Sequence, residues 1–94
     1  MKPLLEHKAS RLNGSSFRVL YDINDQSGLH TVELIGSLTK NEDGIFFVDT
    51  CRYVSGPGPA NNVLENFRPV LNNYHQRHEV SNYIETNLKE AKII

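Results

Sequence analysis

Cysteine is nearly absent from this 94-residue sequence, in which Cys51 is the only one. A single cysteine cannot form an internal disulfide, and no stretch at the start combines a basic flank with an apolar segment of signal-peptide length. Long apolar runs are also missing. The longest are a few residues, such as IFFV at 45–48, whereas a membrane-spanning helix needs about 20. We therefore expect a cytoplasmic protein that does not span a membrane.

An excess of charge of one sign is also missing, because the net charge is −1. Residues 1–20 carry four basic side chains and one acidic one, and residues 21–50 carry six acidic side chains and one lysine. Neither segment forms the dense basic stripe of a protein held to nucleic acid by many phosphate contacts. Nucleic-acid binding is therefore an alternative only, and the N-terminal basic arm would supply its contacts: Lys2, Lys8, Arg11 and Arg18.

The remaining composition is that of an ordered protein, with 38% apolar and 22% charged residues. A chain of this length buries roughly 60–65% of its unfolded surface, which leaves room for one modest core. We expect a single domain over residues 1–94.

Two segments show the two-residue alternation of half-buried strands, at 17–24 and 30–39, and a third at 45–54 is rich in β-branched and aromatic residues. Turn-forming residues separate them at 24–28 (NDQSG) and at 40–44, which ends in Asp-Gly. Connections this short require antiparallel pairing, because a parallel neighbour needs a crossover of about a dozen residues or more. The sequence predicts an antiparallel meander.

The segment LLEHKASRL (4–12) permits two structures. It could pair with the first strand through Asn13-Gly14, a strong hairpin signal, or form a short helix after Pro3. We favour the hairpin slightly, which gives a sheet of three to four strands.

Segment 45–54 is apolar on both faces of the predicted strand. Either the strand is central and covered on both sides, or a second copy of the protein covers one face. We favour the second explanation because so short a chain has little material with which to cover two faces. The interaction surface would then include the even-numbered apolar residues of this strand and an aromatic residue of the last helix: Phe46, Val48, Val54 and Tyr83.

The C-terminal third has the spacing of amphipathic helices, with apolar residues at 63, 64, 67, 70, 71 and 74 and again at 80, 83, 84, 88 and 91. A proline inside a helix removes a backbone hydrogen bond and clashes with the preceding turn, so Pro69 argues against one straight helix. Asn82 and Glu85 have capping-box spacing and indicate a second start near 79–82. We expect two helices, or one that is bent.

The residues with reactive or metal-binding chemistry give only weak signals. His75 and His78 are three apart and would share a helix face, with Glu79, Asp49 or His30 as further metal ligands. No HExxH motif or cysteine pair supports a metal site, so solvated histidines at a helix end are favoured. Cys51 lies in the middle of a predicted strand, which favours a buried structural thiol over a nucleophile.

The glycine-rich segment SGPGP (55–59) also has a structural explanation. Phosphate-binding loops work through backbone N–H donors, and each proline here lacks one. No Lys-Ser or Lys-Thr pair follows, as a Walker A loop requires. We expect a strand-to-helix connector and no cofactor.

These observations predict an α+β fold with a three- to four-stranded antiparallel sheet and two C-terminal helices, or one bent helix, on one face. The predicted function is non-enzymatic protein–protein interaction, as a small regulator, inhibitor or assembly factor. The partners would be a second copy, in a homodimer formed through the sheet, and an unidentified protein. Alternatives are nucleic-acid binding, or a small enzyme or metal protein using His75 and His78 or Cys51.

Overall fold

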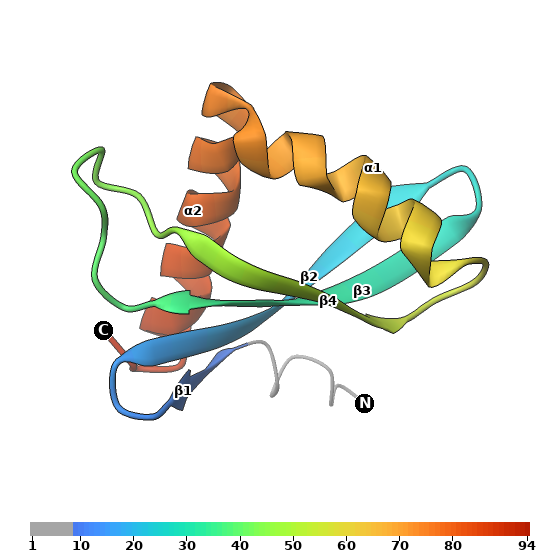
Figure 1. The fold of residues 1–94 in the computed structure, drawn as a ribbon. Coiled ribbons are helices and arrows are strands. Elements are labelled where there is room, and N and C mark those ends of the chain that lie inside the picture. The colour runs from blue at the N-terminus through green and yellow to red at the C-terminus, as the bar shows by residue number, and fades with distance from the viewer. Residues whose placement is uncertain (1–8) are drawn as a thin grey trace.

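A computed structural model describes residues 9–94 of the chain as a twisted sheet with two helices on one face (Figure 1). The strands form an antiparallel meander in the order β1-β2-β3-β4. This arrangement confirms the predicted α+β fold, with four strands and two separate helices. The elements are β1 Ala9–Leu12, β2 Ser16–Asp25, β3 Gly28–Ser37, β4 Val48–Ser55, α1 Ala60–Asn72 and α2 Tyr74–Glu90.

The first hairpin joins β1 to β2. The Asn13-Gly14 pair predicts this pairing, and it is confirmed for residues 9–12. Leu12 pairs with Ser16, and both Asn13 (φ 48°) and Gly14 (φ 77°) adopt the left-handed conformation of the turn. Asparagine and glycine tolerate this conformation better than other residues, which explains why the chain reverses here. The rest of segment 4–12 lies outside the described residues.

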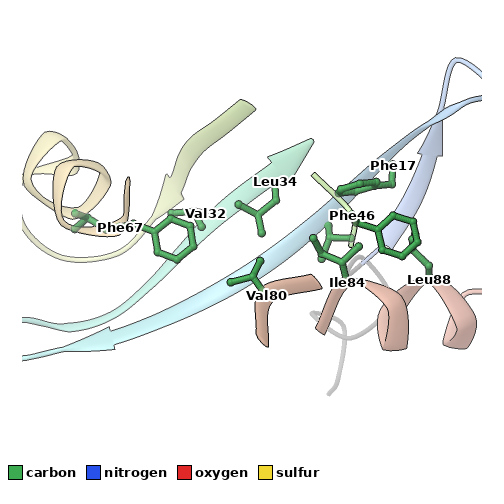
Figure 2. Packing of buried hydrophobic residues seen from close by; sticks show 10 residues of the cluster. Phe17, Val32, Leu34, Phe46, Phe67, Val80, Ile84 and Leu88 are labelled. Atoms are coloured by element: carbon green, nitrogen blue, oxygen red, sulfur yellow. The ribbon is translucent and has the colours of Figure 1, made fainter. Parts of the chain in front are cut away.

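The core lies between the helices and the sheet face that they cover (Figure 2). Alternate residues of the two long central strands point into it, because successive side chains of a strand point to opposite faces. From β2 these include Phe17 and Val19, and from β3 Val32 and Leu34, all fully buried. The helices contribute side chains at intervals of three to four residues: Val63, Phe67, Val80, Ile84 and Leu88.

β4 begins three residues later than the sequence predicts, at Val48 instead of Ile45. Gly36 pairs with Val48, whereas Ile35 pairs with Thr50, so Asp49 is an extra residue in a β-bulge. A bulge reverses the alternation of side chains along a strand. The expectation of one regular strand over 45–54 is therefore wrong.

The two helices meet at Asn73 and not near 79–82 as predicted. The Asn73 side chain accepts a hydrogen bond from the Gln76 backbone N–H at 3.1 Å, so this asparagine is the N-cap of α2. Asn82 lies inside α2 and is exposed. Pro69 lies in the last part of α1.

In residues 9–94, neither helix has both the length and the apolar character needed to span a bilayer.

Candidate protein-contact groove

The four residues proposed as an interaction surface do not share one face. Phe46 is a core residue, only 4% exposed, and its ring packs edge-on against Phe17 with 5.8 Å between centroids. Val48 also packs against the core, on the side covered by the helices. Val54 is 45% exposed near the other end of β4, beyond the bulge. The bulge explains why residues of the same parity separate.

Tyr83, the fourth of these residues, is half-buried and packs against the core. Its hydroxyl donates a hydrogen bond to the Leu20 carbonyl oxygen at 2.6 Å. Its ring packs edge-on against Tyr21, with 4.9 Å between centroids. Tyr83 therefore attaches α2 to β2.

An exposed apolar site lies instead in the connection between β3 and β4. Phe47 follows the buried Ile45 and Phe46, yet 53% of it is exposed. The sequence gives no means of telling Phe46 from Phe47, because both are phenylalanines in an apolar run. Their different burial follows from how the connection is anchored.

Asn41 fixes the shape of this connection from its own turn. Its side-chain oxygen accepts hydrogen bonds from the backbone N–H groups of Asp43 (2.9 Å) and Ile45 (3.2 Å). Its own N–H donates to the Ile45 carbonyl oxygen at 2.9 Å. The turn thus directs the next residues back toward the helices.

Ser81 of α2 fastens the connection to the core. Its hydroxyl, in a residue only 2% exposed, accepts a hydrogen bond from the Phe46 backbone N–H at 2.8 Å. A buried N–H without a partner costs about 1–3 kcal/mol, so this contact holds the backbone of Phe46 in place. With Phe46 turned inward, its neighbour Phe47 points away from the core.

Phe47 forms one edge of a groove of about 190 Å³ between this connection and the junction of the two helices. The connection contributes one wall, and the end of α1 and the start of α2 contribute the other. The lining residues are Ile45, Phe46, Phe47, Val48, Arg68, Leu71, Asn72, Arg77 and Val80. Small-molecule pockets run from about 300 Å³ upwards, so the volume suits one large side chain better than a cofactor.

The charged residues of the groove are both arginines. Arg68 of α1 is exposed and forms no ion pair with any residue of 9–94. Arg77 of α2 has only a long ion pair, with 3.7 Å between its Nη2 and Asp43 Oδ2. The Asp43 side chain is 58% exposed, and pairs between exposed groups contribute about 0–1 kcal/mol. The groove is therefore apolar with a positive rim.

Cys51 lies on β4 near Arg68 and is half-buried. Burial raises the pKa of its thiol to about 11, and the positive charge of Arg68 offsets this only in part. The thiolate is the reactive form, so the thiol is almost wholly protonated at neutral pH. This setting agrees with a structural cysteine.

The described part of the basic arm is engaged within the molecule. Arg11 donates hydrogen bonds to the carbonyl oxygens of Gly14 and Ile93. Arg18 pairs with Glu33, which also receives Arg52 at 3.0 Å. Lys2 and Lys8 lie outside the described residues. Two of the four proposed phosphate contacts therefore already have partners.

His75 and His78 lie in the first turns of α2, where both rings pack edge-on against Tyr74. The centroid distances are 5.5 Å for His75 and 4.7 Å for His78. Nε2 of His78 is buried and has no hydrogen-bond partner among residues 9–94. Over that same range, no three histidine, cysteine, aspartate or glutamate side chains gather as a metal site would require.

A buried histidine that the sequence did not mark as central joins the β2–β3 turn to β4. His30 is fully buried, with its Nε2 2.8 Å from Ser27 Oγ and 3.1 Å from Asp25 Oδ1. Its Nδ1 lies 3.2 Å from the Tyr53 hydroxyl. A Cβ on Gly56 would lie 2.7 Å from both of those atoms, so backbone already fills the space beside them. We interpret this cluster as structural.

No protein-family model matches the sequence, and comparisons with curated proteins and with solved structures found no similar protein.

Proposed function

We propose that this protein is a non-enzymatic protein-contact module, a small regulator, inhibitor or assembly factor, that binds a segment of another protein in the groove beside Phe47. One observation carries the proposal: a phenylalanine that is 53% exposed stands at the edge of an apolar groove. Large aromatic side chains next to a pocket are the usual anchors of protein interfaces.

The rigidity of the groove supports this proposal. Its walls are fixed by buried residues, since Ser81 holds the Phe46 backbone and Val80 is part of the core. A preformed site loses little conformational entropy on binding, which favours affinity from a small contact. The groove therefore suits an extended or helical segment that inserts one side chain.

Self-association remains a prediction, and the groove changes where we would place it. The sheet face away from the helices carries a buried ionic cluster, in which Glu33 is 4% exposed between Arg18 and Arg52. An apolar homodimer through the middle of that face is not favoured by these charges. A second copy could instead contact Phe47, and light scattering over a dilution series would detect it as a concentration-dependent mass.

Site-specific crosslinking tests the proposed function. A photo-reactive phenylalanine analogue would replace Phe47 in the full chain produced in its native host, and the same analogue at the exposed Thr86 of α2 would serve as the control. We expect a discrete adduct of higher mass from position 47 and none from position 86. Equal yields from both positions, or no adduct from either, would remove the groove as a contact site.

Nucleic-acid binding is the weaker candidate because Arg11 and Arg18 are engaged internally. A gel shift at low salt tests it, since phosphate contacts weaken steeply as salt rises. The enzyme alternative is weaker still, because the Cys51 thiol is protonated at neutral pH.

A further inference from the structure

We propose that the segment bound in the groove is acidic as well as apolar: a large apolar side chain with a neighbouring aspartate or glutamate. This inference rests on the proposed function and specifies the chemistry of the partner. It is drawn from the two charged residues that line the groove in the described part of the chain, which are both positive.

Among residues 9–94, the lining contains two arginines and no acidic residue. The chain as a whole has 11 acidic and 10 basic residues, so a positive site is not a consequence of overall composition. Arg68 comes from α1 and Arg77 from α2, and the junction at Asn73 brings the two helix ends together. The fold thus places two positively charged side chains beside the apolar lining of the groove.

Neither cation is fully neutralised inside the molecule. Arg68 forms no ion pair within residues 9–94, and Arg77 makes only the 3.7 Å contact with the exposed Asp43. A partner carboxylate could pair with Arg68 directly and could replace Asp43 at Arg77. Arginine suits this task because its planar guanidinium can hold a carboxylate through two parallel hydrogen bonds.

The geometry also separates the two parts of the expected ligand. The buried lining residues Ile45, Phe46 and Val80 would receive a side chain such as leucine or phenylalanine, while the two arginines of the helices would pair with the carboxylate. A basic segment would instead place like charges together, which disfavours binding. Charge complementarity therefore selects an acidic partner segment over a neutral or basic one.

A random heptapeptide library displayed on phage and selected on the full chain tests this inference. Selected peptides would be synthesised with a fluorophore, and their dissociation constants would be measured by fluorescence polarisation at low and moderate salt. We expect enriched sequences to contain aspartate or glutamate within a residue or two of a large apolar residue. We also expect binding to weaken as salt rises, because exposed charge pairs are screened.

The matched variants are Arg68→Glu in the groove and Lys92→Glu as the control. Both substitutions reverse one exposed positive charge. Lys92 lies just after the C-terminal end of α2, whereas Arg77 lies near the N-terminal end of this helix. We expect Arg68→Glu to raise the dissociation constant about tenfold and Lys92→Glu to leave it within about twofold. Far-UV circular dichroism would establish that both variants are folded, and Arg68→Gln repeats the test without introducing an acidic group.

The outcomes separate the two proposals. Enrichment of apolar peptides with neutral or basic flanks, or affinity unchanged by Arg68→Glu and Arg68→Gln, would overturn the acidic partner while leaving the groove as a binding site. Peptides whose binding does not depend on Phe47, or no enriched peptide at all, would overturn both.

Discussion

Phe46 and Phe47 are adjacent and chemically identical, but the structure assigns them opposite roles. Phe46 is 4% exposed and packs against Phe17 in the core, whereas Phe47 is 53% exposed at the groove. Replacing each in turn by alanine therefore tests how the β3–β4 connection is folded. Phe46→Ala should strongly destabilise the protein, and Phe47→Ala should not.

The size of the difference follows from burial. Truncating a buried phenylalanine to alanine costs about 3–5 kcal/mol, from lost apolar burial and the cavity left behind. Exposed substitutions usually change stability by about 0.5 kcal/mol or less. A domain of this size is stable by roughly 5–14 kcal/mol in total, so the Phe46 change removes a third or more in most of that range.

Urea denaturation followed by far-UV circular dichroism measures this difference. With a slope of about 1.5 kcal/mol per molar urea, Phe46→Ala should lower the midpoint by about 2–3 M and Phe47→Ala by less than about 0.4 M. Equal shifts for the two variants, or a larger one for Phe47→Ala, would refute the inward orientation of Phe46 and with it the groove.

Three further predictions concern the cysteine, the ionic cluster and the helix junction. Because burial raises the pKa of the Cys51 thiol to about 11, alkylation by iodoacetamide near neutral pH should be about 100-fold slower than for a free thiol and should accelerate into the alkaline range. Burial acts to raise the pKa of Glu33, but hydrogen bonds from Arg52 and Arg18 outweigh it and the pKa is lowered. The Glu33 carboxylate therefore contributes stability above its unfolded pKa of about 4.3, and this contribution is lost as pH falls through its folded pKa. Glu33→Gln should consequently show a smaller fall in urea midpoint between about pH 6 and pH 3 than the wild type. Asn73→Ala should cost about 1 kcal/mol by removing the N-cap of α2, whereas Asn82→Ala should change stability by about 0.5 kcal/mol or less in the same assay.

Each of these predictions has a clear contrary result. Alkylation of Cys51 at the rate of a free thiol would place it outside the buried setting described. An unchanged pH dependence in Glu33→Gln would mean that the ionic cluster does not couple to folding. A larger effect at Asn82 than at Asn73 would place the start of the second helix where the capping-box spacing predicted it.

The fold class could be predicted because its signals are local and repeated. The alternation at 17–24 and 30–39 and the three-to-four spacing after Val63 each extend over several residues, and short connections permit only antiparallel pairing. The Asn13-Gly14 pair likewise predicted the first hairpin, in which residues 9–12 pair with β2. Features of this kind can be predicted from a sequence because many weak local preferences agree on them.

The site could not be predicted in the same way because it depends on tertiary contacts. The bulge at Asp49 is set by pairing with β3, and the inward turn of Phe46 depends on Ser81, 35 residues away. The sequence predicts the start of the second helix near 79–82, later in the chain than its true start, because Asn82 and Asn73 are both asparagines. Only Asn73 has its side chain at a helix start. Arg68 and Arg77 line the same groove only because the chain turns at the junction of the two helices.

The most direct test of the groove as a contact surface is the dissociation constant of a bound partner, either the crosslinked protein or a selected peptide, for the wild type and for Phe47→Ala. The loss of an interface anchor is worth about 1–2 kcal/mol or more, so the dissociation constant should rise at least fivefold to thirtyfold while the urea midpoint changes by less than about 0.4 M. Thr86→Ala should leave both values unaltered. A dissociation constant that is the same with and without the Phe47 ring would contradict the account.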